Sequence, residues 1–182
     1  MQNVRTLKDV DFVITGIPFD TCTTYRDGSR FGPSSVREMS GLAAKPYNPE
    51  LGVDIFQELS GVDDGDIGTV PGYIEESFSE IQKEMTEIFA AGVVSVTIGG
   101  DHSVTLPELR ACASVYGPVA LVLFDAHYDT VKEYFGKPYT HGTPFYHAAA
   151  GHLAGNALYE IETERKSGIE FDAKKVKKLL KG

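Results

Sequence analysis

The fold is decided by residues 93–129, VVSVTIGGDHSVTLPELRACASVYGPVALVLFDAHYD. Two short runs, residues 93–98 and 119–124, flank a stretch of helical character at residues 106–115. Each run is largely β-branched or aliphatic and does not alternate with polar residues, which is typical of a parallel strand covered on both faces. Strand, helix and strand in this order predict the α/β class with a mainly parallel sheet.

Metal-capable side chains follow both predicted strands. Asp125, His127 and Asp129 are spaced two apart after the second strand. In extended backbone they would project from one face, while Tyr128 would point away from them. His102 brings one more imidazole to the end of the first strand. Because open α/β sheets bind ligands beyond the carboxyl ends of their strands, we expect the two ends to form one metal site.

Carboxylate and imidazole donors without a thiolate favour Mn²⁺, with Zn²⁺, Co²⁺ or Ni²⁺ as alternatives. The role of Asp101 stays open at this point, since it could support a metal ligand or cap the loop. The pair Gly99 and Gly100 is interpreted as a tight turn, because no GxGxxG or Gly-Lys-Ser/Thr pattern accompanies it.

His141 lies in a loop rich in turn-forming residues, soon after the Asp-x-His-x-Asp motif. Such a histidine could be a proton shuttle near the metal, since imidazole titrates close to neutral pH, or an ordinary surface residue. His147 and His152 fall on a predicted helix at residues 144–153, and we interpret both as structural or exposed.

The remaining predicted elements are less directly tied to chemistry. Residues 12–17 read as a buried strand that leads into a polar loop, and Ser34 or Ser35 could cap a helical turn at residues 36–39. Residues 63–72 are predicted to be a second loop. Apolar residues from Ile74 to Ile88 recur at steps of three and four, which predicts an amphipathic helix.

The composition bounds the class of protein. The chain has 182 residues, of which 42% are hydrophobic, enough for one ordinary globular domain. A formal net charge of −9 argues against nucleic acid or an anionic membrane as the partner and suits a small cationic ligand. The two cysteines are far apart, and neither a signal peptide nor a membrane-spanning run is recognised, so we expect a soluble, cytoplasmic protein.

Residues 154–182 differ in character from the rest of the chain. They hold seven basic and five acidic residues, whereas residues 1–153 carry a net charge of −11. Residues 171–180 could form a short amphipathic helix, but a frayed tail is the preferred interpretation, because a single short helix is marginal unless it docks. We therefore expect a division into residues 1–153 and a divergent basic tail at 154–182.

Taken together, these motifs resemble the ureohydrolase family of arginases, agmatinases and related guanidino hydrolases. The resemblance runs from about Asp11 to Leu153 and includes GIPFD at 16–20, RDGSRFGP at 26–33, DGD at 64–66, GGDHS at 99–103, DAHYD at 125–129 and HGT at 141–143. Residues 46–50 and the His-Gly-Thr loop are more similar to agmatinases than to arginases.

The resemblance implies a three-layer α/β/α domain, a homo-oligomer of three or six subunits and a binuclear manganese centre. His102 and Asp129 would bind one ion, His127 would bind the other, and Asp125 would bridge both. A metal-bridged hydroxide would attack the guanidinium carbon of an agmatine-like substrate and release urea and an amine. His141 matches the proton-transfer histidine of the family.

Family members also carry, well downstream, an Asp-x-Asp motif that completes both metal sites and an acidic residue that holds the guanidinium. Neither is recognised before Gly182. We therefore interpret residues 1–153 as the N-terminal portion of a ureohydrolase α/β domain, with a sheet that is incomplete at its C-terminal side and one ion, or weakly bound metal. The alternatives are a non-catalytic fragment that binds metal or forms oligomers, and an amidinohydrolase for another guanidino or formimino compound.

Overall fold

The computed structural model describes residue 7 and residues 9–43, 45–151 and 154–162, the last of these at the level of the backbone. The predicted short helix at 171–180 and His152 lie outside the described residues. Among the described residues, no helix combines the length and the apolar character that a membrane span requires.

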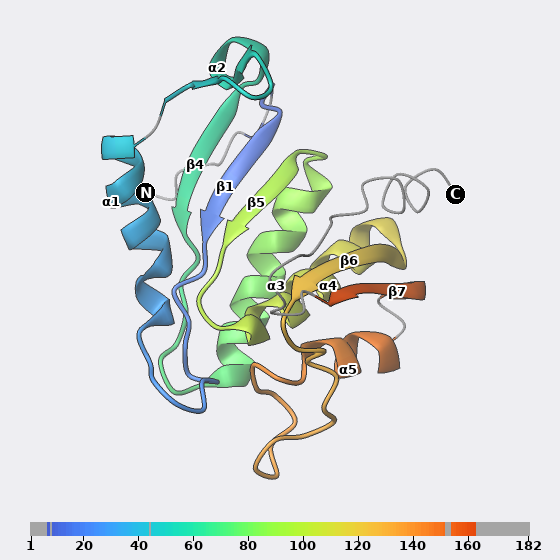
Figure 1. Ribbon diagram of the computed structural model, residues 1–182. Helices are drawn as coiled ribbons and strands as arrows, with labels where there is room; N and C mark the ends of the chain where they lie inside the picture. Colours follow the sequence, from blue (N-terminus) through green and yellow to red (C-terminus); the bar gives the residue numbers. More distant parts are fainter. Residues whose placement is uncertain (1–6, 8, 44, 152–153, 163–182) are drawn as a thin grey trace.

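The centre of the molecule is a parallel sheet in the order β4-β1-β5 (Figure 1). β1 (Phe12–Gly16) pairs on one side with β4 (Gly61–Asp66) and on the other with β5 (Val94–Ile98). A second parallel pair joins β6 (Val119–Asp125) to β7 (Ala154–Glu162). The mainly parallel sheet and its flanking helices confirm the predicted α/β class with three α/β/α layers.

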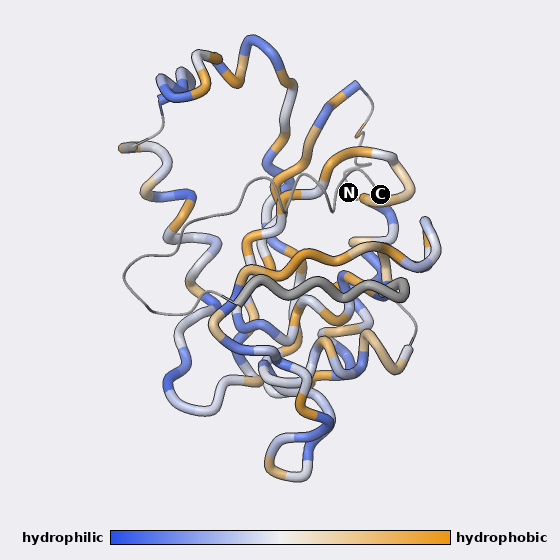
Figure 2. The backbone as a smooth tube through the Cα atoms, turned by 45° about the vertical axis from the view of Figure 1, so that its right-hand side comes forward, coloured by the Kyte–Doolittle hydropathy of each residue, from blue (hydrophilic) through white to orange (hydrophobic). Residues whose placement is uncertain are grey.

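Helices cover the sheets and carry much of the core. α3 (Ile74–Ala90) and α4 (Thr105–Tyr116) lie side by side behind the strands, and α1 (Gly32–Ala43) lies beside β4 (Figure 1). α3 buries Phe78, Ile81, Met85 and Ile88, the face that the helical spacing predicts. Each such side chain contributes about 1.5–3 kcal/mol when fully removed from water. Figure 2 shows hydrophobic residues, in orange, alternating with hydrophilic ones, in blue, along the backbone.

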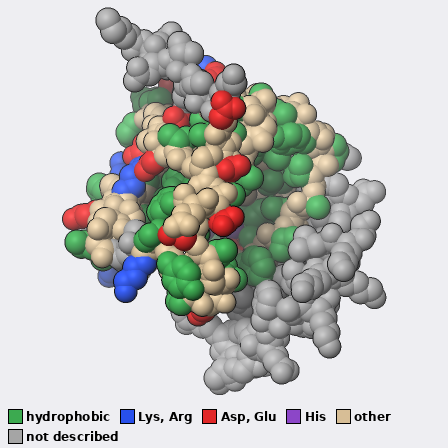
Figure 3. Space-filling view, turned by 90° about the horizontal axis from the view of Figure 1, so that it is seen from above, with side chains coloured by type: hydrophobic (Ala, Val, Ile, Leu, Met, Phe, Trp, Pro, Cys, Tyr) green, Lys and Arg blue, Asp and Glu red, His purple; other side chains and the backbone are tan. Residues whose placement is uncertain are grey.

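The smaller elements complete the chain. They are the single-turn 3-10 helices η1 (Ser29–Phe31) and η2 (His102–Val104), the short strands β2 (Tyr47–Asn48) and β3 (Val53–Asp54), and the helices α2 (Ile55–Glu58) and α5 (Pro144–Ala150). β2 and β3 pair in antiparallel fashion. Figure 3 looks onto the end of the molecule that bears α2 and shows hydrophobic side chains over a broad area, with basic side chains at one side.

Four features of the fold differ from the prediction. Residues 63–66 form the end of β4 and not a loop, because their backbone pairs with β1 and Arg37 of α1 binds the carboxylates of Asp63 and Asp66. α1 begins at Gly32, so Ser34 lies inside the helix and donates to the Phe31 carbonyl instead of capping. Residues 154–162 pair with β6, so the predicted tail begins with a strand.

The relation between β5 and β6 is the fourth difference. The strand-helix-strand pattern suggested neighbouring strands in one sheet, but β5 and β6 belong to separate sheets in the described part of the chain. A cavity of about 400 Å³ is lined by residues of both strand ends, including Thr97 and Asp125.

The loop after β5 contacts the loop after β1 so closely that only glycine fits. A Cβ atom on Gly100 would lie 1.7 Å from the carbonyl oxygen of Phe19, far inside van der Waals contact. The amide of the next residue, Asp101, donates to that same carbonyl at 2.7 Å. The glycine pair therefore makes a close-packed turn, as predicted, and it joins two loops at the carboxyl ends of the strands.

Substitution of Gly100 tests this contact. We expect Gly100→Ala to lower the free energy of unfolding by about 3 kcal/mol, because the backbone of Phe19 must move. Gly41→Ala is the matched control, since Gly41 lies in α1 with open space around it and alanine raises helix propensity by about 0.5–1 kcal/mol. Urea denaturation of both variants measures the difference, and a Gly100→Ala variant as stable as the parent chain would contradict the steric argument.

Candidate metal centre

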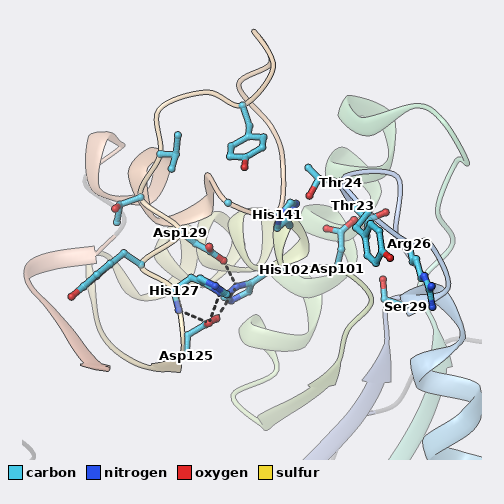
Figure 4. A pocket seen from close by; sticks show the side chains of 16 residues that line it. Thr23, Thr24, Arg26, Ser29, Asp101, His102, Asp125, His127, Asp129 and His141 are labelled. Carbon is cyan, nitrogen blue, oxygen red and sulfur yellow. Dashed lines mark hydrogen bonds and ion pairs between the residues drawn. The ribbon is translucent and has the colours of Figure 1, made fainter. Parts of the chain in front are cut away.

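Three potential metal ligands meet at the carboxyl ends of β5 and β6. His102 begins η2 after β5, Asp125 ends β6, and Asp129 lies in the loop that follows. One ligand atom from each residue lies within 4.8 Å of the other two. His102 Nδ1 is 2.7 Å from Asp129 Oδ2 and 3.3 Å from Asp125 Oδ2 (Figure 4).

The backbone after β6 forms this cluster differently from the extended geometry that the sequence suggested. β6 ends at Asp125, whose Oδ1 accepts a hydrogen bond from the His127 amide at 2.9 Å. Such a bond from residue i+2 is the turn that aspartate favours. Asp129 has φ = 45°, a left-handed conformation that Asp adopts more readily than most residues. The turn thus returns Asp129 to the cluster. The sequence pattern had instead predicted extended backbone, in which residues spaced two apart share one face.

His127 lies outside the cluster of three. Its side chain is 82% exposed, and its Nδ1 is 3.8 Å from Asp125 Oδ1. The ligand atoms of His102, Asp125 and Asp129 come together without it. The assignment of His127 as a metal ligand stays a prediction. Tyr128 is half-exposed and lies in the wall of the same cavity.

The cluster lies in a cavity of about 800 Å³. Its walls come from the loop after β1 (residues 23–29), the loop after β5, the loop after β6 and residues 141–142. Asp101, Asp125 and Asp129 contribute carboxylates to the lining, and Arg26 contributes one guanidinium. The excess of acidic groups makes this cavity favourable for a cation.

His141 lies in the same cavity and is held by the loop after β1. Its Nδ1 is 2.8 Å from the carbonyl oxygen of Cys22, and its backbone amide donates to that oxygen at 3.4 Å. His147, in contrast, places its Nε2 2.7 Å from the Pro138 carbonyl, outside the cavity lining. The structure therefore places His141 in the cavity of the metal-capable cluster, while its role in proton transfer stays a prediction, and His147 makes its hydrogen bond outside that cavity.

Two buried aspartates hold the loop after β1 in place. Asp20 accepts hydrogen bonds from the Gly28 amide at 2.7 Å and from Arg30 Nε at 2.6 Å. The hydrogen bond from the Arg30 guanidinium lowers the pKa of Asp20 to about 2. Asp101 accepts from the Cys22 amide at 2.9 Å. Sequence reasoning included Asp20 in a motif and left Asp101 open, but it missed Cys22, because Cys22 acts through its backbone and leaves no side-chain signal.

A second cavity, of about 400 Å³, adjoins the first and shares His102 and Asp125 with it. Glu108 of α4 lines this second cavity. Burial raises the pKa of Glu108 to about 7, while a hydrogen bond from Thr97 opposes this shift. The metal-capable cluster is therefore approached from two sides.

The donor set fits a divalent metal. Two carboxylates and one imidazole are the ligand types that Mn²⁺ and similar ions take, and a cation between Asp125 and Asp129 relieves the repulsion of two close carboxylates. His102 Nδ1 already lies between their oxygens (Figure 4).

This chain is therefore an α/β protein with a metal-capable site. The site is a cluster of two carboxylates and one imidazole at the carboxyl ends of parallel strands. A model of the arginase family matches residues 10–177 of this chain. The chain belongs to the arginase family. The matched range extends past residue 153, into the segment that the sequence alone separated as a tail.

Individual relatives agree with this family. Agmatinase from Proteus mirabilis is 43% identical over 141 residues, which cover 77% of this chain and 45% of that protein. Proclavaminate amidinohydrolase from Streptomyces clavuligerus has a solved structure with a TM-score of 0.78 and 32% identity, covering 93% of this chain and 56% of that one. Formiminoglutamase from Trypanosoma cruzi, solved with Mn²⁺, has a TM-score of 0.67 and 30% identity, covering 76% and 47%. The chain thus spans about half the length of these relatives.

Metal titration of single-residue variants tests the cluster. We expect His102→Ala to weaken Mn²⁺ binding at least about 10-fold, because it removes a ligand that faces both carboxylates. We expect a smaller effect for His127→Ala, since this side chain is exposed and lies outside the cluster. His147→Ala is the control and should bind Mn²⁺ as the parent chain does. Calorimetry checks the order, and a larger loss in His127→Ala than in His102→Ala would contradict it.

The thiol of Cys22 gives an independent test of burial at this loop. Burial raises the pKa of Cys22 to about 12, so the thiol stays protonated and unreactive at pH 8. Cys112, the other cysteine, is less buried. We expect native Cys112→Ala to resist labelling by a thiol reagent at pH 8 and to react once denaturant is added. Rapid labelling of the native variant would show that the loop after β1 opens.

Proposed function

We propose that His102, Asp125 and Asp129 hold a manganese ion, and that this site hydrolyses a guanidino compound of the agmatine type to urea and an amine. The observation that carries the proposal is the meeting of three ligand atoms within 4.8 Å in the cavity that also holds His141. Similarity to agmatinase over 77% of this chain supports the reaction class.

The charge of the cavity suits the proposed substrate. A guanidinium group is cationic, and three carboxylates line the cavity against one guanidinium, that of Arg26. The guanidinium carbon of Arg26 lies 5.2 Å from the centre of the exposed Tyr25 ring, so this positive charge makes a cation-π contact. The remaining negative potential attracts a small cation to the cluster.

The reaction needs a nucleophile and a proton for the leaving amine. A divalent metal, when bound, lowers the pKa of water toward neutrality and so supplies the nucleophile. Hydrolysis forms a carbon–oxygen bond, breaks a carbon–nitrogen bond and transfers a proton to the departing nitrogen. His141 can carry that proton on Nε2, because its Nδ1 faces the Cys22 carbonyl.

The alternative function is a non-catalytic fragment that binds metal or forms oligomers. One observation favours it: the cluster has three ligands among the described residues. A second alternative is an amidinohydrolase that acts on another guanidino or formimino compound, as the similarity to a formiminoglutamase suggests. The assay below distinguishes these alternatives.

The direct test is urea release with Mn²⁺ from agmatine, arginine and guanidinobutyrate. We expect release from agmatine, and we expect His141→Gln to reduce the rate about 100-fold while Mn²⁺ still binds, since general acid catalysis contributes about 10²–10⁴-fold. His147→Gln, whose ring contacts the Pro138 carbonyl, should retain the rate.

His102→Ala sets the background of the assay. Parent chain that binds Mn²⁺ but releases no urea above this background favours the non-catalytic alternative. Release from guanidinobutyrate and not from agmatine favours a hydrolase for guanidino acids.

A further inference from the structure

We propose that Asp101 is a positioning residue that fixes the tautomer and the orientation of the His141 imidazole through the backbone of Cys22. The inference rests on the proposed function only in giving His141 its role in proton transfer. The contacts that carry it are hydrogen bonds within the chain.

The first step is the tautomer of His141. Its Nδ1 lies 2.8 Å from the Cys22 carbonyl oxygen. A carbonyl oxygen can only accept, so Nδ1 must carry the hydrogen and donate it. Nε2 is then the nitrogen that takes or releases a proton. The backbone amide of His141 donates to the same oxygen at 3.4 Å, so ring and backbone share one acceptor.

The second step is the anchoring of Cys22. Its amide donates to Asp101 Oδ2 at 2.9 Å, across 79 residues of sequence, and both residues are buried. The amide and the carbonyl of one residue are related by only two backbone rotations, φ and ψ. The Thr23 amide and hydroxyl both donate to the Asp20 carbonyl, which restricts the chain on the other side. The direction of the Cys22 carbonyl is therefore set by Asp101 and by this turn.

The third step is the rigidity of Asp101 itself. Its Oδ1 accepts from the amide of Ser103 at 2.9 Å and from the Ser103 hydroxyl. Its backbone amide donates to the Phe19 carbonyl, at the contact that Gly100 permits. Both carboxylate oxygens of Asp101 thus accept hydrogen bonds, and these bonds hold its side chain in one orientation.

Asp101 links the metal-capable cluster to the loop that orients His141. Asp101 directly precedes His102, so the turn that presents a metal-capable imidazole also anchors the loop that orients His141. Figure 4 shows Asp101 and His141 near one another beside the cluster. The sequence reading left Asp101 either as a support for a metal ligand or as a loop cap. Its hydrogen bonds to Ser103 show the cap, and its bond to Cys22 supports a second histidine.

The tautomer can be read directly by NMR. Long-range ¹H–¹⁵N spectra of the metal-free, ¹⁵N-labelled chain separate protonated from unprotonated imidazole nitrogens, and His141→Gln identifies the resonances of His141. At a pH where the ring is neutral, we expect one protonated nitrogen, Nδ1, and one unprotonated nitrogen, Nε2. The Nε2–H tautomer in the parent chain would overturn the proposal.

Asp101→Asn tests the anchor. The NH2 group of asparagine cannot accept a hydrogen bond and only its carbonyl oxygen can, so either the Cys22 amide or the Ser103 donors lose their acceptor. We expect the single tautomer of His141 to be replaced by averaged nitrogen shifts. Asp20→Asn is the matched control: Asp20 is also a buried carboxylate in the loop system, but its partners are Gly28 and Arg30. It should leave the His141 tautomer unchanged, as should Cys22→Ala, which keeps the carbonyl.

An unchanged His141 tautomer in a folded Asp101→Asn variant would overturn the proposal, as would equal loss in Asp20→Asn. If Asp101→Asn fails to fold, as circular dichroism would reveal, hydrogen exchange of the Cys22 amide in the parent chain decides. Protection of this amide supports the anchor, and exchange at the rate of an exposed amide contradicts it. None of these measurements depends on urea release, so a chain without activity can still confirm or refute the positioning.

Discussion

The contact between the Phe19 carbonyl and the turn at Gly100 and Asp101 is the constraint on which the rest of the structure depends. It requires a residue without a side chain at position 100, because a Cβ there would lie 1.7 Å from the oxygen. Once the contact forms, the loop after β1 lies against the loop after β5. Asp101, His102 and Cys22 then take up fixed positions, and His141 contacts the Cys22 carbonyl.

The aspartates at the carboxyl ends of the strands differ in the groups that their carboxylates contact. Asp20 is paired with Arg30, and the pKa of its carboxyl is about 2, so it is a structural anion at any physiological pH. Burial raises the pKa of Asp101, and hydrogen bonds from Ser103 and from the Cys22 amide oppose this shift. Asp125 and Asp129 instead face His102, which carries at most one positive charge. Together with Asp101, these two carboxylates outnumber the one guanidinium that lines the cavity, so the cavity favours a cation.

Much of this architecture was predictable from the sequence, because hydrophobic periodicity and glycine turns are local signals. The helix from Ile74, the strands on either side of α4 and the approach of His102 to Asp125 all follow from such signals. The strand β4 did not, since its Asp-rich sequence is stabilised by pairing with β1 and by Arg37, which lies 26 residues away from Asp63. The turn at residues 125–129 also escaped prediction, because a period of two holds only while the backbone stays extended. The backbone of Cys22 has no sequence signature at all.

The separation of β5 from β6 has a mechanical consequence for the metal-capable cluster. His102 belongs to the side of the β4-β1-β5 sheet, whereas Asp125 and Asp129 belong to the side of the β6-β7 pair. In the part of the chain that the structure describes, no backbone hydrogen bonds pair β5 with β6. An ion held by all three residues would cross-link the β4-β1-β5 sheet to the β6-β7 pair. Its binding free energy would add to the cohesion of the chain as well as to its chemistry, by about 2.7 kcal/mol at an ion concentration 100 times the dissociation constant. The cluster would then cross-link the two sheets in addition to its proposed role in hydrolysis.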